Sequence, residues 1–210
     1  MVIAKRKKVG LLSEANEGRS RWPALMIRPV YTCCRPLGKP FAAFCPERVI
    51  LCLQQMPAWI IMEIVKPSEK DFDALTALWE ASVRATHHFL AEADILYFRP
   101  LVRHEFLRQV DLYCINETSI LGFIGLSGPK IEMLFVDPDI LGKGMGKALL
   151  QFAIREKGAT LVDVNEQNEA AVGFYRHMGF KVMARDEKDA LGKPYPVLHM
   201  ELLPRSSSNT

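Results

Sequence analysis

The hydrophobic positions of the chain fall into regular patterns from residue 62 onward. Glu63–Lys66 is typical of a short strand, and the apolar positions after it recur with the 3.6-residue period of a helix. The face that they share consists of Phe72, Leu75, Leu78, Trp79, Ser82 and Val83. Ser68, with Asp71 three residues later, forms a weak capping box, which predicts that this helix begins there.

Short strands and further helices follow in an α/β order. A second helix is predicted over Glu92 to Arg108, limited or kinked by Pro100. The next predicted elements are strands at 111–115, 120–126 and 131–136, a helix at 144–157, a strand at 159–164, a helix at 168–178, and strands at 180–184 and 196–202. This order predicts an α/β fold in which helices flank a mixed central sheet.

The first 61 residues differ from the rest in pattern and composition. They show neither the two-residue period of a strand nor the 3.6-residue period of a helix. They hold 10 Lys and Arg against 3 Asp and Glu, whereas residues 62–210 hold 17 against 21. Four of the five cysteines and six of the thirteen prolines also lie there. We therefore expect 1–61 to be a basic, unstructured extension, or upstream sequence before a true start at Met62, and 62–210 to be the folded domain. A transit peptide and a genuine interaction arm are the alternatives.

Composition narrows the classes of function. Of the 210 residues 24% are charged, the net charge is +3, and the apolar stretch at 49–65 is interrupted by polar residues and a proline. We expect no membrane span and, because the basic run Lys5–Lys8 lacks interleaved aromatic residues, no nucleic-acid partner. The cysteines lack the spacing of a zinc site, so we expect no metal and a reducing, cytoplasmic setting.

The loop before the predicted helix at 144–157 carries the clearest chemistry. It runs Leu141-Gly142-Lys143-Gly144-Met145-Gly146-Lys147. Glycines let a backbone approach a ligand closely, and the free N–H groups of a first helical turn bind anions such as a pyrophosphate. A Walker loop would need glycine at 141 and Ser or Thr at 148, and the dinucleotide fingerprint has another glycine spacing. The loop alone is therefore compatible with a different phosphate ligand or with a structural turn.

Two ordered motifs identify a family. The segment DPDILGKGMGKALL at 137–150 resembles motif A of the GNAT N-acetyltransferase superfamily, and NEQNEAAVGFYRHMGF at 165–180 resembles its next motif. The resemblance covers the chain from Met62 to about Leu203. Segments 82–90, 136–139, 164–175 and 189–196 are similar to the YjaB-type subgroup of bacterial enzymes, which includes peptidyl-lysine N-acetyltransferases. The resemblance implies a GNAT fold whose sheet splays beside the strand at 131–136.

The family resemblance also assigns contacts to acetyl-CoA. The backbones of Phe135 and Val136 are the candidates for the pantetheine arm and the thioester oxygen, and Asn168 for the cofactor arm. The pyrophosphate loop would comprise Leu141, Gly142, Lys143, Gly144, Met145, Gly146 and Lys147. Leu141 stands where the family has Gln or Arg, but that contact is usually made by the backbone, so we expect binding to survive.

The remaining candidates concern proton transfer and the acceptor. Tyr175 matches the family tyrosine that protonates the departing thiolate, although an aromatic residue on a helix face usually packs in the core. Asp163 and Glu132 compete as the base that deprotonates the amine, and either is otherwise a solvated strand residue. His87 is a candidate for the acceptor site, and its alternative is a capping or packing role.

The expected activity is acetyl transfer from acetyl-CoA to a primary amine, with a protein lysine as the favoured acceptor, by direct attack in a ternary complex without a metal. The alternatives are a non-catalytic acyl-CoA-binding sensor module and acetylation of a small-molecule amine. A homodimer is compatible with either.

Overall fold

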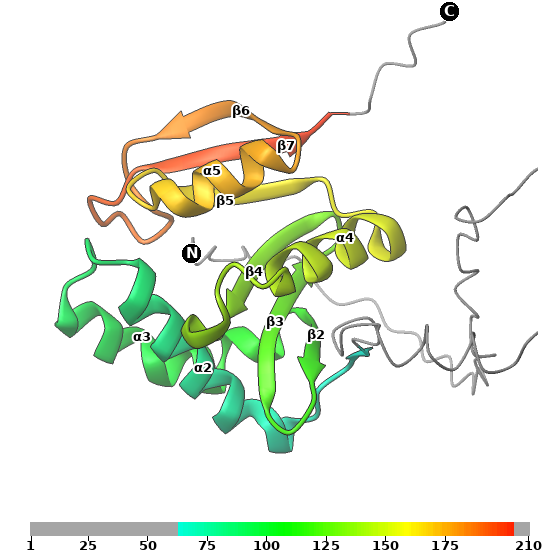
Figure 1. Ribbon diagram of the computed structural model, residues 1–210. Coiled ribbons are helices and arrows are strands. Elements are labelled where there is room, and N and C mark those ends of the chain that lie inside the picture. Colours follow the sequence, from blue (N-terminus) through cyan, green and yellow to red (C-terminus); the bar gives the residue numbers. More distant parts are fainter. Residues whose placement is uncertain (1–62, 204–210) are drawn as a thin grey trace, which may run out of the picture. The chain divides into compact units, whose positions relative to one another are not determined.

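The computed structural model describes residues 63–203 (Figure 1), and the predicted extension at 1–61 lies outside the described residues. The strands are β1 (Ile64–Val65), β2 (Asp111–Asn116), β3 (Ile120–Ser127), β4 (Lys130–Val136), β5 (Leu161–Asn165), β6 (Phe180–Asp186) and β7 (Val197–Leu202). The helices are α2 (Phe72–Thr86), α3 (Glu92–His104), α4 (Met145–Lys157) and α5 (Glu169–His177). None of these helices is long and apolar enough to cross a membrane.

All seven of these strands join one sheet in the order β1-β2-β3-β4-β5-β7-β6. The strands β1 to β4 pair antiparallel with their neighbours, and so do β5, β7 and β6. The two groups meet at β4 and β5, which pair parallel. The expected mixed sheet flanked by helices is confirmed, because a parallel pair in the middle requires the crossover helix α4.

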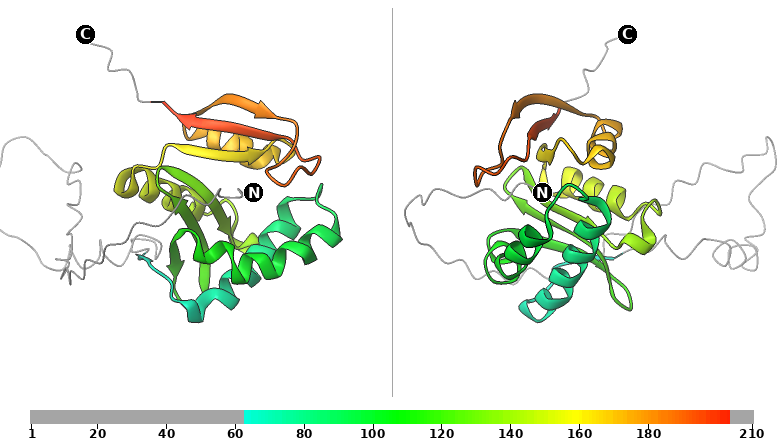
Figure 2. Two further views of the ribbon diagram at one scale, coloured as in Figure 1. Left: turned by 180° about the vertical axis from the view of Figure 1, so that it is seen from behind. Right: turned by 90° about the vertical axis from the view of Figure 1, so that its left-hand side faces the viewer.

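Alternate side chains of the sheet enter two separate cores. On β2, Tyr113 and Ile115 pack in the core that contains α4 and α5, whereas Leu112 and Cys114 pack in the core that contains α2 and α3. Figure 2 shows α4 and the α2–α3 pair on opposite sides of these strands. Burial of both apolar faces is the main force that fixes the sheet between its helices.

β4 and β5 pair at one end only. Their register ends at Ile131 and Val162, although β4 continues to Val136. The register between β4 and β3 skips Glu132, so Glu132 is the extra residue of a β-bulge. A bulge bends its strand, and beyond it β4 turns away from β5 (Figure 1). The predicted splay beside 131–136 is thereby confirmed.

The helix predicted over 92–108 is divided in two. α3 ends at His104, and a separate 3-10 turn covers Phe106–Arg108. Pro100 lies within α3 without ending it. The carbonyl that lacks an N–H partner because of Pro100 belongs to Leu96, whose side chain is exposed, so water can bond to it.

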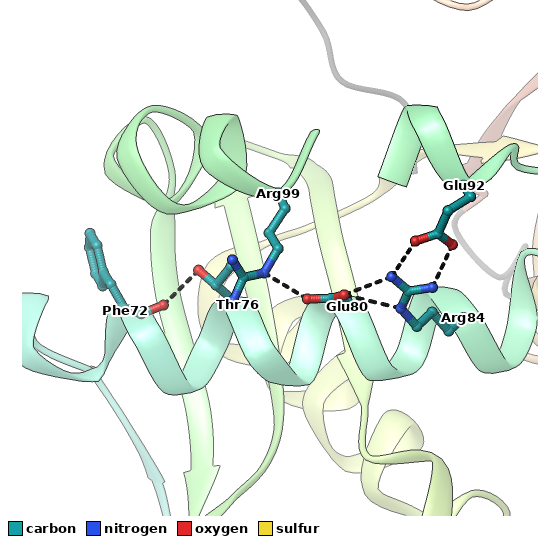
Figure 3. Close-up of polar contacts among 6 residues, drawn as sticks. All are labelled: Phe72, Thr76, Glu80, Arg84, Glu92 and Arg99. Carbon is teal, nitrogen blue, oxygen red and sulfur yellow. Dashed lines mark hydrogen bonds and ion pairs between the residues drawn. The ribbon is translucent and has the colours of Figure 1, made fainter. Parts of the chain in front are cut away.

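Ion pairs on the surface tie α3 to α2 (Figure 3). Glu80 accepts from Arg84 at 2.9 Å and from Arg99 at 2.7 Å. Arg84 also forks onto both carboxylate oxygens of Glu92. Each exposed pair is worth little alone, but a shared network loses less side-chain entropy per contact. The network fixes the ends of the connection at 87–91, which contributes to the site described next.

Candidate active site

A groove of about 520 Å³ runs along the open edge of β4, beside the glycine loop and the faces of α4 and α5. Its size falls within the range of about 300–1,000 Å³ that is usual for small-molecule sites. The predicted acetyl-CoA contacts that line it are Phe135, Val136, Leu141, Gly142, Gly144, Met145, Gly146, Lys147 and Asn168. Tyr175 and His87 line it too. Residues predicted from two separate motifs therefore converge on one groove.

The glycine loop has a backbone conformation that other residues rarely adopt. Gly142 and Gly144 have φ angles of 79° and 91°, and a Cβ added at either would meet no atom within 4 Å. Conformation rather than crowding therefore selects glycine. The first N–H groups of a helix have no intrahelical partners, and Gly144 at the N-cap of α4 offers them no side-chain acceptor. With the positive end of the helix dipole, they suit a pyrophosphate.

Two residues of the glycine loop contribute less to ligand binding in the groove than the family motif suggests. Among the residues that the structure describes, Lys143 does not line the groove, and its N–H donates to the Ile140 carbonyl at 3.2 Å. Leu141 lines the groove with a side chain that is 51% exposed. Its N–H donates to the Pro138 carbonyl at 3.4 Å, which is a long hydrogen bond. The position that departs from the family pattern thus offers the groove an exposed apolar side chain.

The edge of β4 presents backbone donors to the groove. The N–H of Asp137 donates to the Leu121 carbonyl on β3 at 2.9 Å. Because backbone groups alternate along a strand, those of Phe135 point to β3 as well, and those of Val136 point to the open side. Leu134 shares the orientation of Val136 and also lines the groove, although the motifs did not indicate it. Of the two backbone candidates, Val136 is the one whose N–H faces the groove.

A second, smaller cavity of about 60 Å³ opens where β4 and β5 part. Both base candidates, Glu132 and Asp163, line it. It shares Tyr175, Asn168 and His87 with the larger groove. The acid candidate therefore lies where the two cavities meet, and the base candidates lie on the side away from the glycine loop.

Tyr175 is only 5% exposed and packs in the core while lining both cavities. Its ring makes edge-on contacts with Phe174 and Phe180, at centroid distances of 5.2 and 5.4 Å. Burial raises the pKa of the Tyr175 hydroxyl well above its usual range. The phenol therefore carries its proton at neutral pH, as a donor must.

Asp163 is held by two basic side chains. Its Oδ2 accepts from Lys130 Nζ at 2.6 Å, and its Oδ1 lies 2.7 Å from His199 Nδ1. On the other side of the His199 ring, Nε2 lies 3.1 Å from an Asp186 oxygen. Burial opposes the charged form of His199, but its contacts with Asp163 and Asp186 prevail and raise its pKa. Both Asp163 oxygens are thus engaged, and a Glu132 oxygen lies 3.8 Å from the same Lys130 nitrogen.

His87 is 6% exposed and lines the groove, the β4–β5 cavity and a third cavity. Its Nδ1 lies 2.8 Å from Thr86 Oγ1, and its Nε2 lies 3.4 Å from Asn168 Nδ2. Burial lowers the pKa of His87 to about 3, so the ring is neutral at pH 7. Asn168, at the start of α5, also accepts the Ala171 N–H at 3.0 Å. His87 therefore stands at the junction of all three cavities.

The third cavity, of about 20 Å³, has mostly apolar walls, and we call it the apolar slot; the sequence located it only as a region. Its lining consists of Trp79, Val83, His87, Phe89, Leu90, Phe98, Asn165, Asp189, Tyr195 and Val197. One wall, the loop between β6 and β7, is fastened to α3: Tyr195 donates to Asp94 at 2.6 Å, and Lys193 pairs with the same carboxylate. We call these three residues the clasp. They stand about a hundred residues apart in the chain, and no local motif connects them.

Comparison with known proteins bears on the family and the fold. Residues 108–182 match the acetyltransferase (GNAT) domain family. Peptidyl-lysine N-acetyltransferase YjaB of Salmonella typhimurium is 40% identical over 143 residues, which are 67% of this chain and 98% of that protein. The solution structure of apo-form YjaB from Escherichia coli is 39% identical, with a TM-score of 0.63, and the match covers 69% of this chain and 99% of that one.

A more distant solved structure supports the fold alone. PaiA N-acetyltransferase from Thermoplasma acidophilum, crystallised in complex with coenzyme A, is 22% identical and aligns with a TM-score of 0.54. The match covers 66% of this chain and 98% of that one.

Proposed function

The chain belongs to the GNAT N-acetyltransferase family, and from this premise we propose that it transfers the acetyl group of acetyl-CoA to the side-chain amine of a protein lysine. The observation that carries the proposal is the junction at His87, where the groove beside the glycine loop meets the cavity of the base candidates and the apolar slot; Asn168 and Tyr175 line the first two. Two substrates can therefore be held side by side, which suits direct attack in a ternary complex.

The groove fits acetyl-CoA in both of its parts. The uncapped start of α4 and the open glycine loop suit the pyrophosphate, and the apolar length of the groove beside β4 suits the pantetheine arm. Acetyl-CoA would supply the acetyl group as a reactive thioester. The N–H of Val136 is the proposed donor to the thioester oxygen as charge develops there. We further propose that the enzyme works in the cytoplasm, and a homodimer is compatible with this function.

Tyr175 is the proposed general acid. Its buried hydroxyl keeps its proton at neutral pH and lies at the meeting of the two cavities. A phenol in this position stabilises a departing thiolate by donating a hydrogen bond as the negative charge develops. Because the raised pKa disfavours the phenolate, this donor stays available through the physiological pH range.

Glu132 is the proposed base, in preference to Asp163. Lys130 and His199 already engage both oxygens of Asp163, so an amine would have to displace one of these contacts to reach that carboxylate. Glu132 lies on the β-bulge, lines the β4–β5 cavity and has a side chain that is 17% exposed. In this assignment Asp163 orients Lys130, and Lys130 in turn limits the motion of the Glu132 carboxylate.

A lysine side chain is the proposed acceptor. The apolar slot, at about 20 Å³, has room for little more than one water molecule, so it can take the terminal amine beside His87 but not the four-carbon stem. The peptidyl-lysine activity named for the relatives supports the same acceptor. This likeness, rather than the size of the slot, is the reason that we favour the peptide over a small-molecule amine.

Thiol release from acetyl-CoA, followed with a panel of lysine peptides and small amines, tests the proposal. We expect turnover with lysine peptides above all. Turnover with small amines alone would make the acceptor a metabolite, and tight acetyl-CoA binding without turnover on any acceptor would favour a sensor.

A further inference from the structure

A directed chain of hydrogen bonds connects the start of α5 to the end of α2 through His87. The Ala171 N–H donates to Asn168 Oδ1 at 3.0 Å, so the other end of that amide, Nδ2, must be the atom 3.4 Å from His87 Nε2. On the far side of the ring, Thr86 Oγ1 lies 2.8 Å from Nδ1 and donates its own hydrogen to the Ser82 carbonyl at 2.7 Å. Every member of the chain is thus assigned a direction.

These directions determine the tautomer of His87. The Thr86 hydroxyl has one hydrogen, which the Ser82 carbonyl accepts, so its oxygen can only accept from His87 Nδ1. The proton of the neutral ring therefore sits on Nδ1, and Nε2 keeps its lone pair. The opposite tautomer would set an Nε2–H against the Nδ2–H donors of Asn168, which is unfavourable in a buried site.

The contact that Nε2 makes in this structure is weak. At 3.4 Å the hydrogen bond from Asn168 is longer than the usual 2.7–3.2 Å. The ring is also held in place by Phe89 and Phe135, at centroid distances of 5.4 and 6.5 Å. A fixed lone pair with a poor donor, at the junction of the groove and the apolar slot, is suited to accept an N–H from an incoming amine.

We propose that Thr86 is a positioning residue for the acceptor: its hydroxyl holds His87 in the Nδ1–H tautomer and thereby presents the Nε2 lone pair to the N–H of the acceptor amine. A hydrogen bond from that amine to Nε2 would orient the nitrogen lone pair toward the groove without removing its proton, which Glu132 receives. The inference rests on the proposed function, since it requires an amine acceptor at the junction beside His87.

The test compares two substitutions at Thr86 in the full chain. Thr86→Val keeps the shape and removes the hydroxyl, whereas Thr86→Ser keeps the hydroxyl. Two-bond proton–nitrogen spectra of protein labelled with ¹⁵N-histidine show which ring nitrogen carries the proton, and His87→Gln assigns the signal. We expect Nδ1–H in the wild type and in Thr86→Ser, and a shift toward Nε2–H in Thr86→Val.

Kinetics supply the second readout. In Thr86→Val we expect kcat/KM for a lysine peptide to fall about tenfold, the effect of one lost hydrogen bond, with acetyl-CoA affinity within about twofold of wild type. Thr86→Ser is expected to restore peptide turnover to within about twofold, since its hydroxyl can make the same bonds. A wild-type His87 protonated on Nε2, or normal peptide kinetics in Thr86→Val, would overturn the inference. A wild-type protein that acetylates no amine contradicts the proposed function instead, while its histidine spectrum still tests the tautomer.

Discussion

The two walls of the proposed site differ in the kind of group that they offer. The proposed acetyl-CoA wall offers backbone: the glycine loop, the uncapped start of α4 and the edge of β4. The proposed acceptor wall offers side chains that come from distant parts of the chain, such as His87, Asp163 and the clasp of Asp94, Lys193 and Tyr195. A backbone site leaves a compact sequence motif, because glycine and helix-start signals must be adjacent. A side-chain site leaves none.

Tyr175, which touches both walls, should give the largest effect. Tyr175→Phe removes the proton donor and keeps the ring that packs against Phe174 and Phe180. We expect kcat at pH 7 to fall about a hundredfold or more, the usual contribution of a general acid, with acetyl-CoA affinity nearly unchanged. Stopped-time thiol assays and calorimetric titration measure the two quantities. Unchanged turnover would remove Tyr175 from the mechanism.

The two carboxylates on the acceptor side should behave differently. Glu132→Gln removes the proposed base, and we expect kcat/KM for a lysine peptide to fall about a hundredfold at pH 7, the low end of the usual contribution of a general base. Asp163→Asn serves as the matched variant: it loosens Lys130 and His199, and its main expected effect is a lower melting temperature. A larger kinetic loss in Asp163→Asn than in Glu132→Gln would reverse the assignment.

The backbone character of the acetyl-CoA wall can be tested at a single glycine. Gly144→Ala forces a Cβ into a left-handed conformation, which costs about 1–2 kcal/mol, so we expect the Kd of acetyl-CoA to rise about tenfold. Gly192→Ala is the control, since Gly192 also has a positive φ and open surroundings but lies in the β6–β7 loop. Equal losses of acetyl-CoA affinity in both variants would mean that general destabilisation is the cause.

The clasp should give the smallest effect, confined to the acceptor. Asp94→Asn weakens the contacts to Lys193 and Tyr195 that hold one wall of the slot. We expect KM for a lysine peptide to rise about threefold, as suits a partly exposed ion pair, with no change in acetyl-CoA affinity. Asp73→Asn breaks another pair on α3, with Arg103, away from the slot, and should leave both constants alone. A rise in KM for both variants would place the effect in α3 itself.

This contrast also explains what the sequence could predict. The fold followed from periodicity: each predicted strand and helix is present. The helix over 92–108 is divided at a place where the pattern gave no stop signal, and the first helix begins after Ser68 with a 3-10 turn at Glu69–Asp71 before α2. The acetyl-CoA wall followed from two motifs that were each contiguous. Leu134 was missed because its contribution is a backbone direction set by strand register, which carries no residue signature.

The acceptor wall could be predicted only as a region. His87 and Asn168 are 81 residues apart, and Asp94 and Tyr195 are 101 apart, so their contacts depend on how the sheet brings α2, α3 and the β6–β7 loop together. The sequence could not decide between Glu132 and Asp163 as the base for the same reason. Only the three-dimensional arrangement reveals that Lys130 and His199 already occupy the Asp163 oxygens.

Initial rates measured over a grid of acetyl-CoA and lysine-peptide concentrations test most directly whether the two walls hold their substrates at the same time. Direct attack across the junction at His87 and Tyr175 predicts double-reciprocal lines that intersect. Parallel lines, the pattern of a covalent acetyl-enzyme that forms before the acceptor binds, would contradict the account.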